Sequence, residues 1–211
     1  MDVAVKAANK TRGGGDTSRS VPIKLKKVGI IGAGQMGNGI AHVIALAGYD
    51  VVMNDLKKEA VDRAMQTIDR NMNRQIAKGL ITKDAHDAAI KRVGYAPDYT
   101  ALGDCDLVIE AATEDESVKR RIFTDLCQHL KPEAMVASNT SSISITRLAS
   151  TTDRPERFIG MHFMNPVPMM ELVELIRGIA TEDETFSTTK AFVESLGKTT
   201  AVSEDFPAFI V

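Results

Sequence analysis

The chain has 211 residues, a formal net charge of −2, 44% hydrophobic residues and 26% charged residues. This composition is ordinary for a soluble globular protein and supplies enough apolar residues for one good-sized core. The small net charge argues against nucleic acid as the principal partner, and no apolar run approaches the ~20 residues of a membrane-spanning helix.

The first 23 residues show no sustained periodicity and include Thr11-Arg-Gly-Gly-Gly-Asp-Thr-Ser-Arg-Ser20. This composition predicts a disordered tail. The segment lacks the apolar region of a secretory signal, and Asp2 and Asp16 argue against a mitochondrial presequence. Because Cys105 and Cys127 have neither zinc-site nor disulfide spacing, we expect reduced, buried thiols in a cytoplasmic protein.

An apolar run over residues 28–31 breaks at a glycine turn and continues as an apolar helical pattern through Ala47. In the context of strand, turn and helix, the spacing of Gly32, Gly34 and Gly37 indicates dinucleotide binding. Gly32 permits the tight turn, Gly34 lets a pyrophosphate approach the backbone, and Gly37 allows close packing of helix on strand. We therefore expect the N–H groups at the start of the helix to face the phosphates.

A second strand over residues 50–54 ends at Asp55, about twenty residues beyond the glycines, where this fingerprint places an acid. A carboxylate there would accept hydrogen bonds from the ribose hydroxyls and repel a 2′-phosphate, which favours NAD over NADP. The alternative is a solvated strand end, and the neighbouring Lys57 and Lys58 leave NADP open.

Two helices are predicted next, over residues 58–78 and 83–92, with Thr82 as the N-cap of the second. Their surplus of Lys and Arg either meets a phosphorylated substrate or forms an ordinary solvated face. Further strands are predicted over residues 93–95, 106–112 and 134–138, alternating with helices over 117–130 and 144–149. This alternation predicts an α/β fold with a doubly wound, mostly parallel sheet of the Rossmann type, in which ligands lie at the carboxyl ends of the strands.

From residue 157 onward the sequence predicts a strand–turn–strand extension of this sheet. Its strands cover residues 157–163 and 171–176, and the prolines within 165–168 set the turn. Thr181 and Glu184 predict a capping box that opens a helix. That helix is predicted to end at Leu196, and a last strand follows at 198–203.

His162 and Glu174 lie twelve residues apart, six on either side of Pro168. If the chain folds back at Pro168, the two side chains come opposite each other on neighbouring strands. A carboxylate bonded to one ring nitrogen would fix the tautomer, so that the other nitrogen could take the proton of an alcohol during oxidation by NAD. The alternative is a plain cross-strand contact or a satisfied core histidine. The other histidines fall in helical stretches without a partner pattern and are interpreted as structural: His42, His86 and His129.

Three sequence blocks carry a resemblance. They are Gly32-Ala-Gly-Gln-Met-Gly37, Ser138-Asn-Thr-Ser-Ser142, and Gly160-Met-His-Phe-Met-Asn-Pro-Val-Pro168 with Glu171-Leu-Val-Glu174. Together they resemble the L-3-hydroxyacyl-CoA dehydrogenase family over residues 26–211, most closely its short-chain 3-hydroxybutyryl-CoA dehydrogenases. The block around the histidine is much more specific than the glycine fingerprint.

The resemblance implies roles for individual residues. His162 would be the catalytic base and Glu174 its orienting partner. Ser141 would hydrogen-bond the substrate 3-oxygen, and Asn165 would help to hold the substrate. The candidate cofactor-binding residues are Gly32, Gly34, Gln35, Met36, Gly37, Asp55 and Asn139, together with Glu114 and Lys119 at family positions beside the nicotinamide. Alternatively, the Asn-Thr-Ser-Ser block only caps the following helix.

The implied activity is NAD-dependent oxidation of (S)-3-hydroxyacyl-CoA, such as 3-hydroxybutyryl-CoA, to 3-oxoacyl-CoA, and the reverse, in fatty acid or butanoate metabolism. The implied partner is an acyl-CoA thioester, whose phosphates could meet Arg74, Lys78 or Lys83, and no metal is expected. Two alternatives stay open. The chain could be a non-catalytic NAD-binding fragment, or a related dehydrogenase that uses the same His–Glu pair on a hydroxy acid or sugar acid.

Members of the family continue from a Pro-Gly-Phe-like segment into a helical domain that forms a homodimer and closes the substrate cleft. Here that segment reads Pro207-Ala-Phe-Ile-Val211, with Ala208 in place of the glycine. We therefore expect an NAD-binding catalytic domain over residues 24–205, with residues 206–211 as the start of a missing helical domain. NAD binding is expected without that domain, whereas efficient turnover and dimerisation are doubtful.

Overall fold

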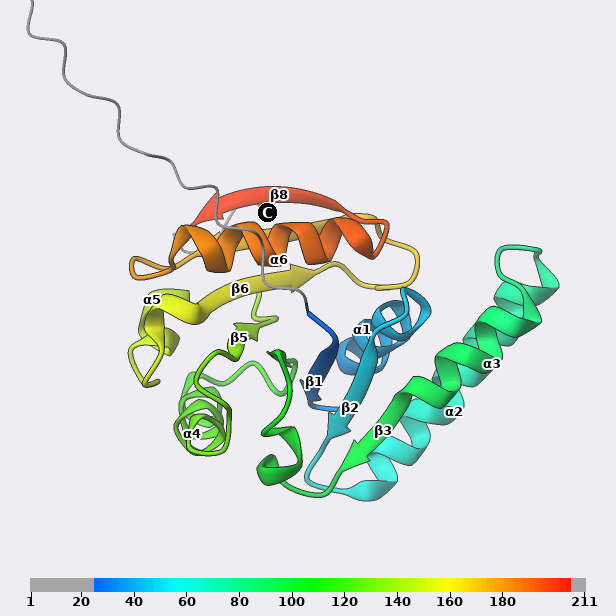
Figure 1. Ribbon diagram of the computed structural model, residues 1–211, viewed down its shortest axis with the longest axis horizontal. Coiled ribbons are helices and arrows are strands. Elements are labelled where there is room, and N and C mark those ends of the chain that lie inside the picture. The colour runs from blue at the N-terminus through cyan, green and yellow to red at the C-terminus, as the bar shows by residue number, and fades with distance from the viewer. Residues whose placement is uncertain (1–24, 206–211) are drawn as a thin grey trace, which may run out of the picture.

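The computed structural model describes residues 25–205, and eight strands within them form one sheet (Figure 1). The strands are β1 (Lys27–Ile31), β2 (Asp50–Asn54), β3 (Val93–Ala96), β4 (Leu107–Glu110), β5 (Met135–Ser138), β6 (Phe158–Phe163), β7 (Leu172–Arg177) and β8 (Thr199–Glu204). Their order is β3-β2-β1-β4-β5-β6-β7-β8, and each neighbouring pair is parallel except β6 and β7. This confirms the predicted α/β fold. The predicted tail and the segment after residue 205 lie outside the described residues.

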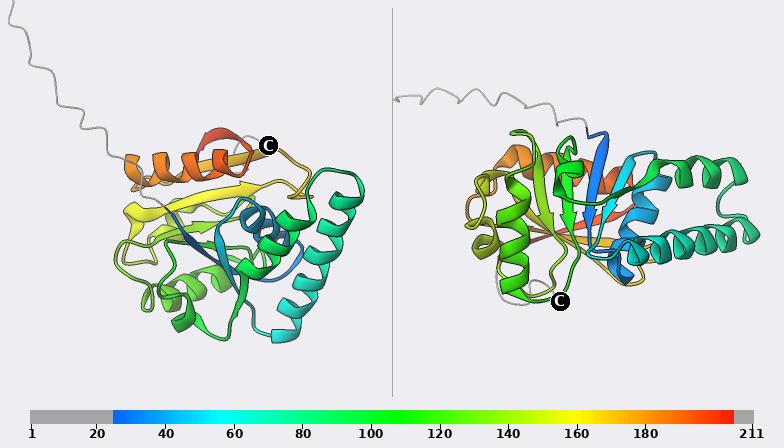
Figure 2. Two further views of the ribbon diagram at one scale, coloured as in Figure 1. Left: turned by 45° about the vertical axis from the view of Figure 1, so that its right-hand side comes forward. Right: turned by 90° about the horizontal axis from the view of Figure 1, so that it is seen from below.

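Helices cover both faces of this sheet (Figure 2). They are α1 (Gln35–Leu46), α2 (Lys58–Ala77), α3 (Lys83–Arg92), α4 (Glu116–Cys127), α5 (Ile145–Ala149) and α6 (Asp183–Ser195), with short 3₁₀ turns at Tyr99–Leu102 and Pro155–Arg157. One face packs against α1, α2 and α6, and the other against α4 and α5. Within residues 25–205, no helix has the length and apolar character needed to cross a membrane.

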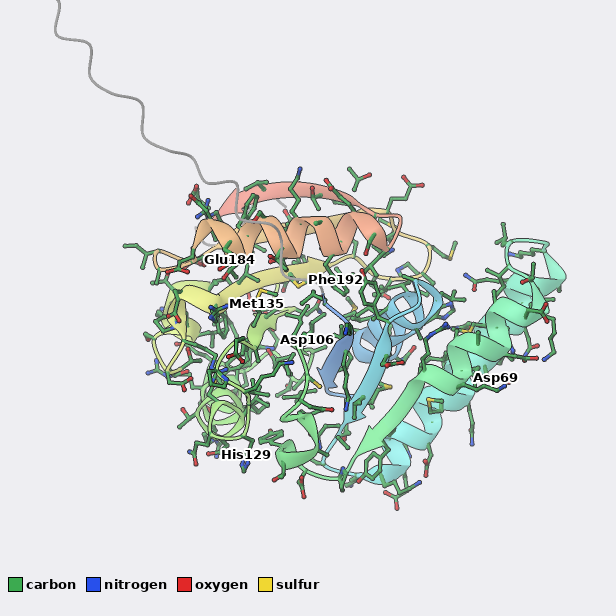
Figure 3. The ribbon with its side chains drawn as sticks, in the orientation of Figure 1. Asp69, Asp106, His129, Met135, Glu184 and Phe192 are labelled. Carbon is green, nitrogen blue, oxygen red and sulfur yellow. The ribbon has the colours of Figure 1, made fainter. Side chains whose placement is uncertain are left out.

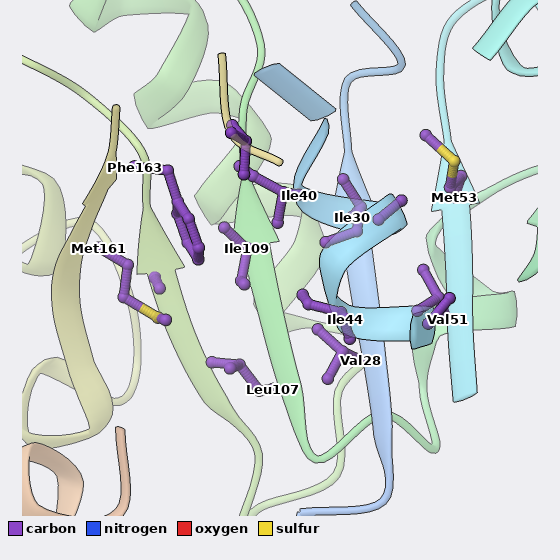
Figure 4. Packing of buried hydrophobic residues seen from close by; sticks show 14 of the residues in the cluster. Val28, Ile30, Ile40, Ile44, Val51, Met53, Leu107, Ile109, Met161 and Phe163 are labelled. Atoms are coloured by element: carbon purple, nitrogen blue, oxygen red, sulfur yellow. The ribbon is translucent and has the colours of Figure 1, made fainter. Parts of the chain in front are cut away.

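Strand residues alternate between two apolar clusters, because successive side chains of a strand point to opposite faces of the sheet. In β4, Leu107 and Ile109 join the cluster beneath α1 and α6, whereas Val108 joins the cluster beneath α4. Both faces are buried, which explains the near-continuous apolar runs of the central strands. Figure 4 shows part of the first cluster, with Ile40 and Ile44 of α1 against the sheet.

The two cysteines are free and buried, as predicted. Cys105 and Cys127 both lie in the cluster beneath α4. Burial raises the pKa of both thiols to about 11, so they stay protonated and unreactive near neutral pH.

The predicted capping box of Thr181 and Glu184 is wrong. Helix α6 begins at Asp183, and no side chain in the described part of the chain caps it. The Thr181 hydroxyl instead donates to the main-chain oxygen of Phe158 and accepts from the N–H of Gly178. This side chain therefore connects the turn after β7 to β6. The spacing of Thr181 and Glu184 in the sequence does not indicate this long-range contact.

Helix α4 ends at Cys127, three residues before the predicted end at Leu130. Arg154, which is 5% exposed, donates to the main-chain oxygens of Cys127, where the helix ends, and of Lys131. The hydrogen bond to Cys127 satisfies one of the last carbonyl groups of the helix, which have no partner within it. Leu130 is still buried, so its apolar signal is correct although its helical assignment is not.

Asp205, the last described residue, holds the N-terminus of α5. Its carboxylate accepts from the N–H groups of Ile145 and Thr146, each at 2.8 Å, and from the Ser144 hydroxyl at 2.7 Å. Burial opposes the ionisation of this group, but the hydrogen bonds from Thr146 and Ser144 outweigh it and lower the pKa of Asp205 below its ordinary value. The carboxylate therefore binds the first N–H groups of α5 beside its N-cap, Ser144, from the residue that follows β8.

Replacing Asp205 with asparagine is expected to lower the free energy of unfolding by about 1 kcal/mol at neutral pH, the upper end for losing a carboxylate charge at a helix N-terminus. Because the folded-state pKa is lowered, the carboxylate contributes stability above its unfolded-state pKa of about 3.9, and this contribution is lost as the pH falls through the folded-state pKa. Urea denaturation at neutral and strongly acidic pH measures the difference, which should shrink in acid. Asp183→Asn, at a 93% exposed carboxylate, is the matched control. A difference that stays constant with pH would contradict the role of the charge.

Candidate functional site

The turn between β1 and α1 requires glycine at two positions. Gly32 has φ +96°, and a Cβ there would lie 2.6 Å from the main-chain oxygen of Ala111. A Cβ on Gly37 would lie 1.8 Å from the main-chain oxygen of Gly32. At Gly34 a Cβ would meet no described atom within 4 Å. The first and third glycines therefore make the turn and the helix–strand packing, and the second leaves open space beside the backbone.

A cavity of about 530 Å³ opens beside this turn, at the carboxyl ends of β1, β2 and β4. Its lining includes Gly32, Gly34, Gln35, Met36, Asp55, Tyr99, Val118 and Ile122. The Asp55 carboxylate accepts a hydrogen bond from the N–H of Ala33 at 2.8 Å, which holds the acid next to the glycine turn. A carboxylate on one wall and apolar side chains on another suit a ribose next to an adenine.

The N-terminus of α1 differs from those of α3, α4 and α5. The latter are capped by the side chains of Thr82, Asp115 and Ser144. Helix α1 has Gly34 as its N-cap, with no cap bond from any described side chain and no acid in its first turn. The first N–H groups of a helix lack partners within it and carry partial positive charge. Since Gly34 and Gln35 line the cavity, these groups fit the pyrophosphate of a dinucleotide.

A second cavity, of about 310 Å³, adjoins the first, since Met36, Ala111 and Ala112 line both. Its lining also includes five predicted site residues: Glu114, Asn139, Ser141, His162 and Asn165. They follow β4, β5 and β6 or lie in β6, so the parallel strand ends gather them at one edge of the sheet. The carboxyl ends of these strands, where ligands are predicted to lie, therefore form a single, continuous region of the structure, called the rim below.

His162 and Glu174 lie directly opposite each other in the antiparallel pair of β6 and β7, in the predicted register. Nδ1 of His162 and Oε2 of Glu174 are 2.7 Å apart. The Glu174 side chain is 1% exposed and the His162 side chain 14%, so the carboxylate lies behind the ring. Within residues 25–205, Oε1 of Glu174 has no hydrogen-bond partner. With Nδ1 assigned as the donor to Glu174, Nε2 is the nitrogen suited to exchange a proton with a ligand.

Glu114 connects the two rim segments, residues 111–114 after β4 and residues 138–142 at the end of β5. Its Oε1 accepts from the Thr140 hydroxyl, from the N–H of Ser141 at 3.0 Å and from the Ser142 hydroxyl at 3.1 Å. Partial burial raises its pKa, but the hydrogen bond from Thr140 and the charge of Lys119 outweigh this, so the pKa of Glu114 lies below its ordinary value. Glu114 is therefore an anion near neutral pH, and it orders the segment that carries Ser141.

The two asparagines make long-range contacts that tie the site together. Oδ1 of Asn139 accepts from the N–H of Phe163 at 2.9 Å, directly after His162. Oδ1 of Asn165 accepts from Nε2 of Gln35 at 3.1 Å. The first contact joins β5 to the histidine strand, and the second joins the turn after that strand to the glycine turn.

The family described as 3-hydroxyacyl-CoA dehydrogenase, NAD binding domain, matches residues 27–206. This chain belongs to that family. It is 65% identical over 187 residues to 3-hydroxybutyryl-CoA dehydrogenase from Bradyrhizobium diazoefficiens, a match that covers 89% of this chain and 64% of the relative. A probable 3-hydroxybutyryl-CoA dehydrogenase from Deinococcus radiodurans is 49% identical over 87% of this chain and 66% of its own length.

Among solved structures, (S)-3-hydroxybutyryl-CoA dehydrogenase from Ralstonia eutropha has a TM-score of 0.87 and 44% sequence identity to this chain, covering 89% of this chain and 66% of that one. This chain therefore spans 64–66% of the length of these three members of the 3-hydroxyacyl-CoA dehydrogenase family. The predicted resemblance is confirmed, and so is NAD as the cofactor of the domain.

The three basic residues predicted to meet the phosphates of coenzyme A fall into two groups. Arg74 and Lys78 line a third cavity of about 490 Å³, between α2 and the turn that contains Pro168 and Met169. Lys83 instead forms an ion pair with Asp87, one turn further along α3. Two of the three predicted cations therefore stand beside the turn that follows the histidine strand.

Lys119, like Gly37 and Glu174, is a predicted site residue that lines neither of the first two cavities. It is 1% exposed, and its Nζ lies 2.7 Å from Oε1 of Glu110 and 3.4 Å from Oε2 of Glu114. Sequence reasoning missed Glu110 and the hydroxyls of Ser138 and Thr140. The local sequence offers one signal for Glu110, a charged residue at the end of the apolar run of β4. Strand patterning alone accounts for that residue and does not indicate its buried partners.

Proposed function

We propose that this chain is the NAD-binding catalytic part of an enzyme that interconverts (S)-3-hydroxyacyl-CoA and 3-oxoacyl-CoA. The observation that carries the proposal is the 2.7 Å pair of His162 and Glu174 in a cavity that adjoins the nucleotide cavity. The relatives named 3-hydroxybutyryl-CoA dehydrogenase support a short-chain thioester such as 3-hydroxybutyryl-CoA as the substrate. Residues 24–205 make up the catalytic domain in this proposal.

The residues of the glycine turn and the rim would hold NAD, which would supply the hydride acceptor for C3 of the hydroxyacyl group, and as NADH the hydride donor in reverse. Nε2 of His162 takes the proton of the 3-hydroxyl group as the carbonyl forms. The carboxylate of Glu174 keeps the ring oriented and stabilises the imidazolium that results. The Ser141 hydroxyl donates to the substrate 3-oxygen, and Asn165 holds the substrate beside it.

The glycine turn and the rim hold the cofactor in this proposal. The turn contributes the backbone of Gly32 and Gly34 and the first residues of α1, Gln35 and Met36, while Gly37 lets α1 pack closely against the turn. Asp55 accepts from the ribose hydroxyls and disfavours the 2′-phosphate of NADP. Glu114 and Asn139 border the nicotinamide, and Arg74 or Lys78 meets a phosphate of coenzyme A. The two free thiols support a reducing, cytoplasmic compartment.

The test is the loss of NADH absorbance with and without acetoacetyl-CoA. We expect NADH oxidation that depends on acetoacetyl-CoA, is slower with NADPH, and is inhibited by free coenzyme A. NADH binding without any acetoacetyl-CoA-dependent oxidation would reduce the chain to a cofactor-binding fragment. Turnover of free hydroxy acids that coenzyme A does not inhibit would instead indicate a related dehydrogenase.

A further inference from the structure

A buried ion pair lies beneath the rim of the proposed site. Glu110 is 0% exposed and Lys119 is 1% exposed, and Nζ of Lys119 lies 2.7 Å from Oε1 of Glu110. Removing two charges from water costs about as much as their mutual attraction returns, so such a pair is a poor device for stability alone. Its position therefore matters more than its strength.

Glu110 is the last residue of β4 and binds three separate segments. Besides Lys119 of α4, its carboxylate accepts from the N–H of Ala112 at 2.7 Å and from the Ser138 hydroxyl at 2.6 Å. Its main-chain oxygen accepts from the N–H of Asn139 at 2.8 Å. One side chain thus fixes the starts of both rim segments, residues 111–114 and 138–142, relative to each other.

Two paths lead from this pair to the proposed reacting groups. On one side, Nζ of Lys119 lies 3.4 Å from Oε2 of Glu114, and Oε1 of Glu114 accepts from the N–H of Ser141. On the other side, Asn139 binds the N–H of Phe163, next to His162. Neither Glu110 nor Lys119 lines the two cavities, so both act through other residues.

We propose that Glu110 and Lys119 are a positioning pair for the nicotinamide site. Together they hold the rim segments 111–114 and 138–142 at the separation in which the nicotinamide and the substrate oxygen reach His162. The catalytic half of this inference rests on the proposed function, whereas the cofactor half requires only that the domain binds NADH.

The experiment compares Glu110→Gln and the double variant E110Q/K119M with the wild-type chain. Asp106→Asn is the matched control, because Asp106, labelled in Figure 3, precedes the same strand at its opposite end. Its carboxylate likewise binds a lysine, Lys131, and main-chain N–H groups, those of Lys26 and Lys27. The measurements are NADH affinity by calorimetry, thermal midpoint, amide exchange by mass spectrometry, and kcat and KM for acetoacetyl-CoA.

Glu110→Gln is expected to weaken NADH binding about tenfold and to speed amide exchange in the rim segments about tenfold, since the closing contacts of the rim are lost. Its kcat is expected to fall by up to about 10²-fold, the effect of a ~1 Å misplacement, with KM nearly unchanged. Asp106→Asn is expected to leave NADH affinity and exchange of the rim segments as in the wild type.

The double variant separates positioning from stability. Because E110Q/K119M leaves no uncompensated buried charge, its thermal midpoint should recover toward that of the wild type while NADH affinity and rim exchange do not. Recovery of NADH affinity together with the midpoint would overturn the inference, as would wild-type NADH affinity in Glu110→Gln or faster exchange spread evenly over the sheet. If the wild type binds NADH without reducing acetoacetyl-CoA, the proposed function fails, and the binding and exchange measurements still decide the cofactor half.

Discussion

Replacing His162 with alanine is expected to lower acetoacetyl-CoA-dependent NADH oxidation by about 10³-fold, within the range of 10²–10⁴ that a general base or acid contributes. In the reductive direction the imidazolium must protonate the forming alkoxide, and no other histidine of the described chain lines the second cavity. NADH affinity should change by less than about twofold, because the glycine turn and Asp55 are untouched. Calorimetry with NADH and the absorbance assay together separate the two effects.

Glu174→Gln tests the second half of the pair. The amide keeps the shape but removes the charge behind the ring, and it can hold the imidazole in the wrong tautomer, which in a serine protease triad costs about 10⁴-fold in kcat. We expect a loss of about 10²-fold or more here. His129→Ala is the control, because His129, labelled in Figure 3, is exposed, and its Nδ1 lies at a marginal 3.5 Å from the Thr100 hydroxyl. Equal losses in all three variants would indicate unfolding rather than chemistry.

The histidine–glutamate pair could be predicted because hairpin register depends on local sequence. A turn centred near Pro168 makes residues equidistant from it partners across the hairpin, and the observed pairing of His162 with Glu174 follows that rule. The glycine turn is equally local, since Gly32 and Gly37 are five residues apart. A Cβ on Gly37 would collide with Gly32, and a Cβ on Gly32 would collide with Ala111, directly after β4. Where a few neighbouring residues determine geometry, the sequence was sufficient.

Other features depend on partners that are distant in sequence. Thr181 fits a capping box by spacing, yet its hydroxyl binds the main chain of Phe158, 23 residues away. Lys119 was assigned from its motif position to the nicotinamide, but burial against Glu110 could be known only after α4 was packed on the sheet. Local spacing cannot reveal which polar groups become buried together, because that depends on the tertiary contacts of each helix.

The final prediction concerns two of the three glycines in the turn. Replacement by alanine is expected to have different outcomes at Gly37 and at Gly34. Gly37→Ala would place a Cβ 1.8 Å from the main-chain oxygen of Gly32, and neither backbone can yield without moving α1 away from β1. We expect a loss of about 3 kcal/mol, the upper end for overpacking, and a fall of about 6–12 °C in thermal midpoint. NADH binding should be lost with it, because the start of α1 no longer faces the cavity.

Gly34→Ala adds the same methyl group where no described atom lies within 4 Å, so its thermal midpoint should stay within about 1 °C of the wild type. Gly34 lines the nucleotide cavity, however, and the methyl group would occupy space in which the pyrophosphate approaches the backbone. NADH affinity is therefore expected to fall at least about tenfold, measured by calorimetry on a chain whose thermal midpoint is checked alongside. Unchanged affinity in Gly34→Ala would mean that the pyrophosphate lies elsewhere in the cavity. The difference between the two alanines thus distinguishes a glycine needed for packing from a glycine needed for the ligand.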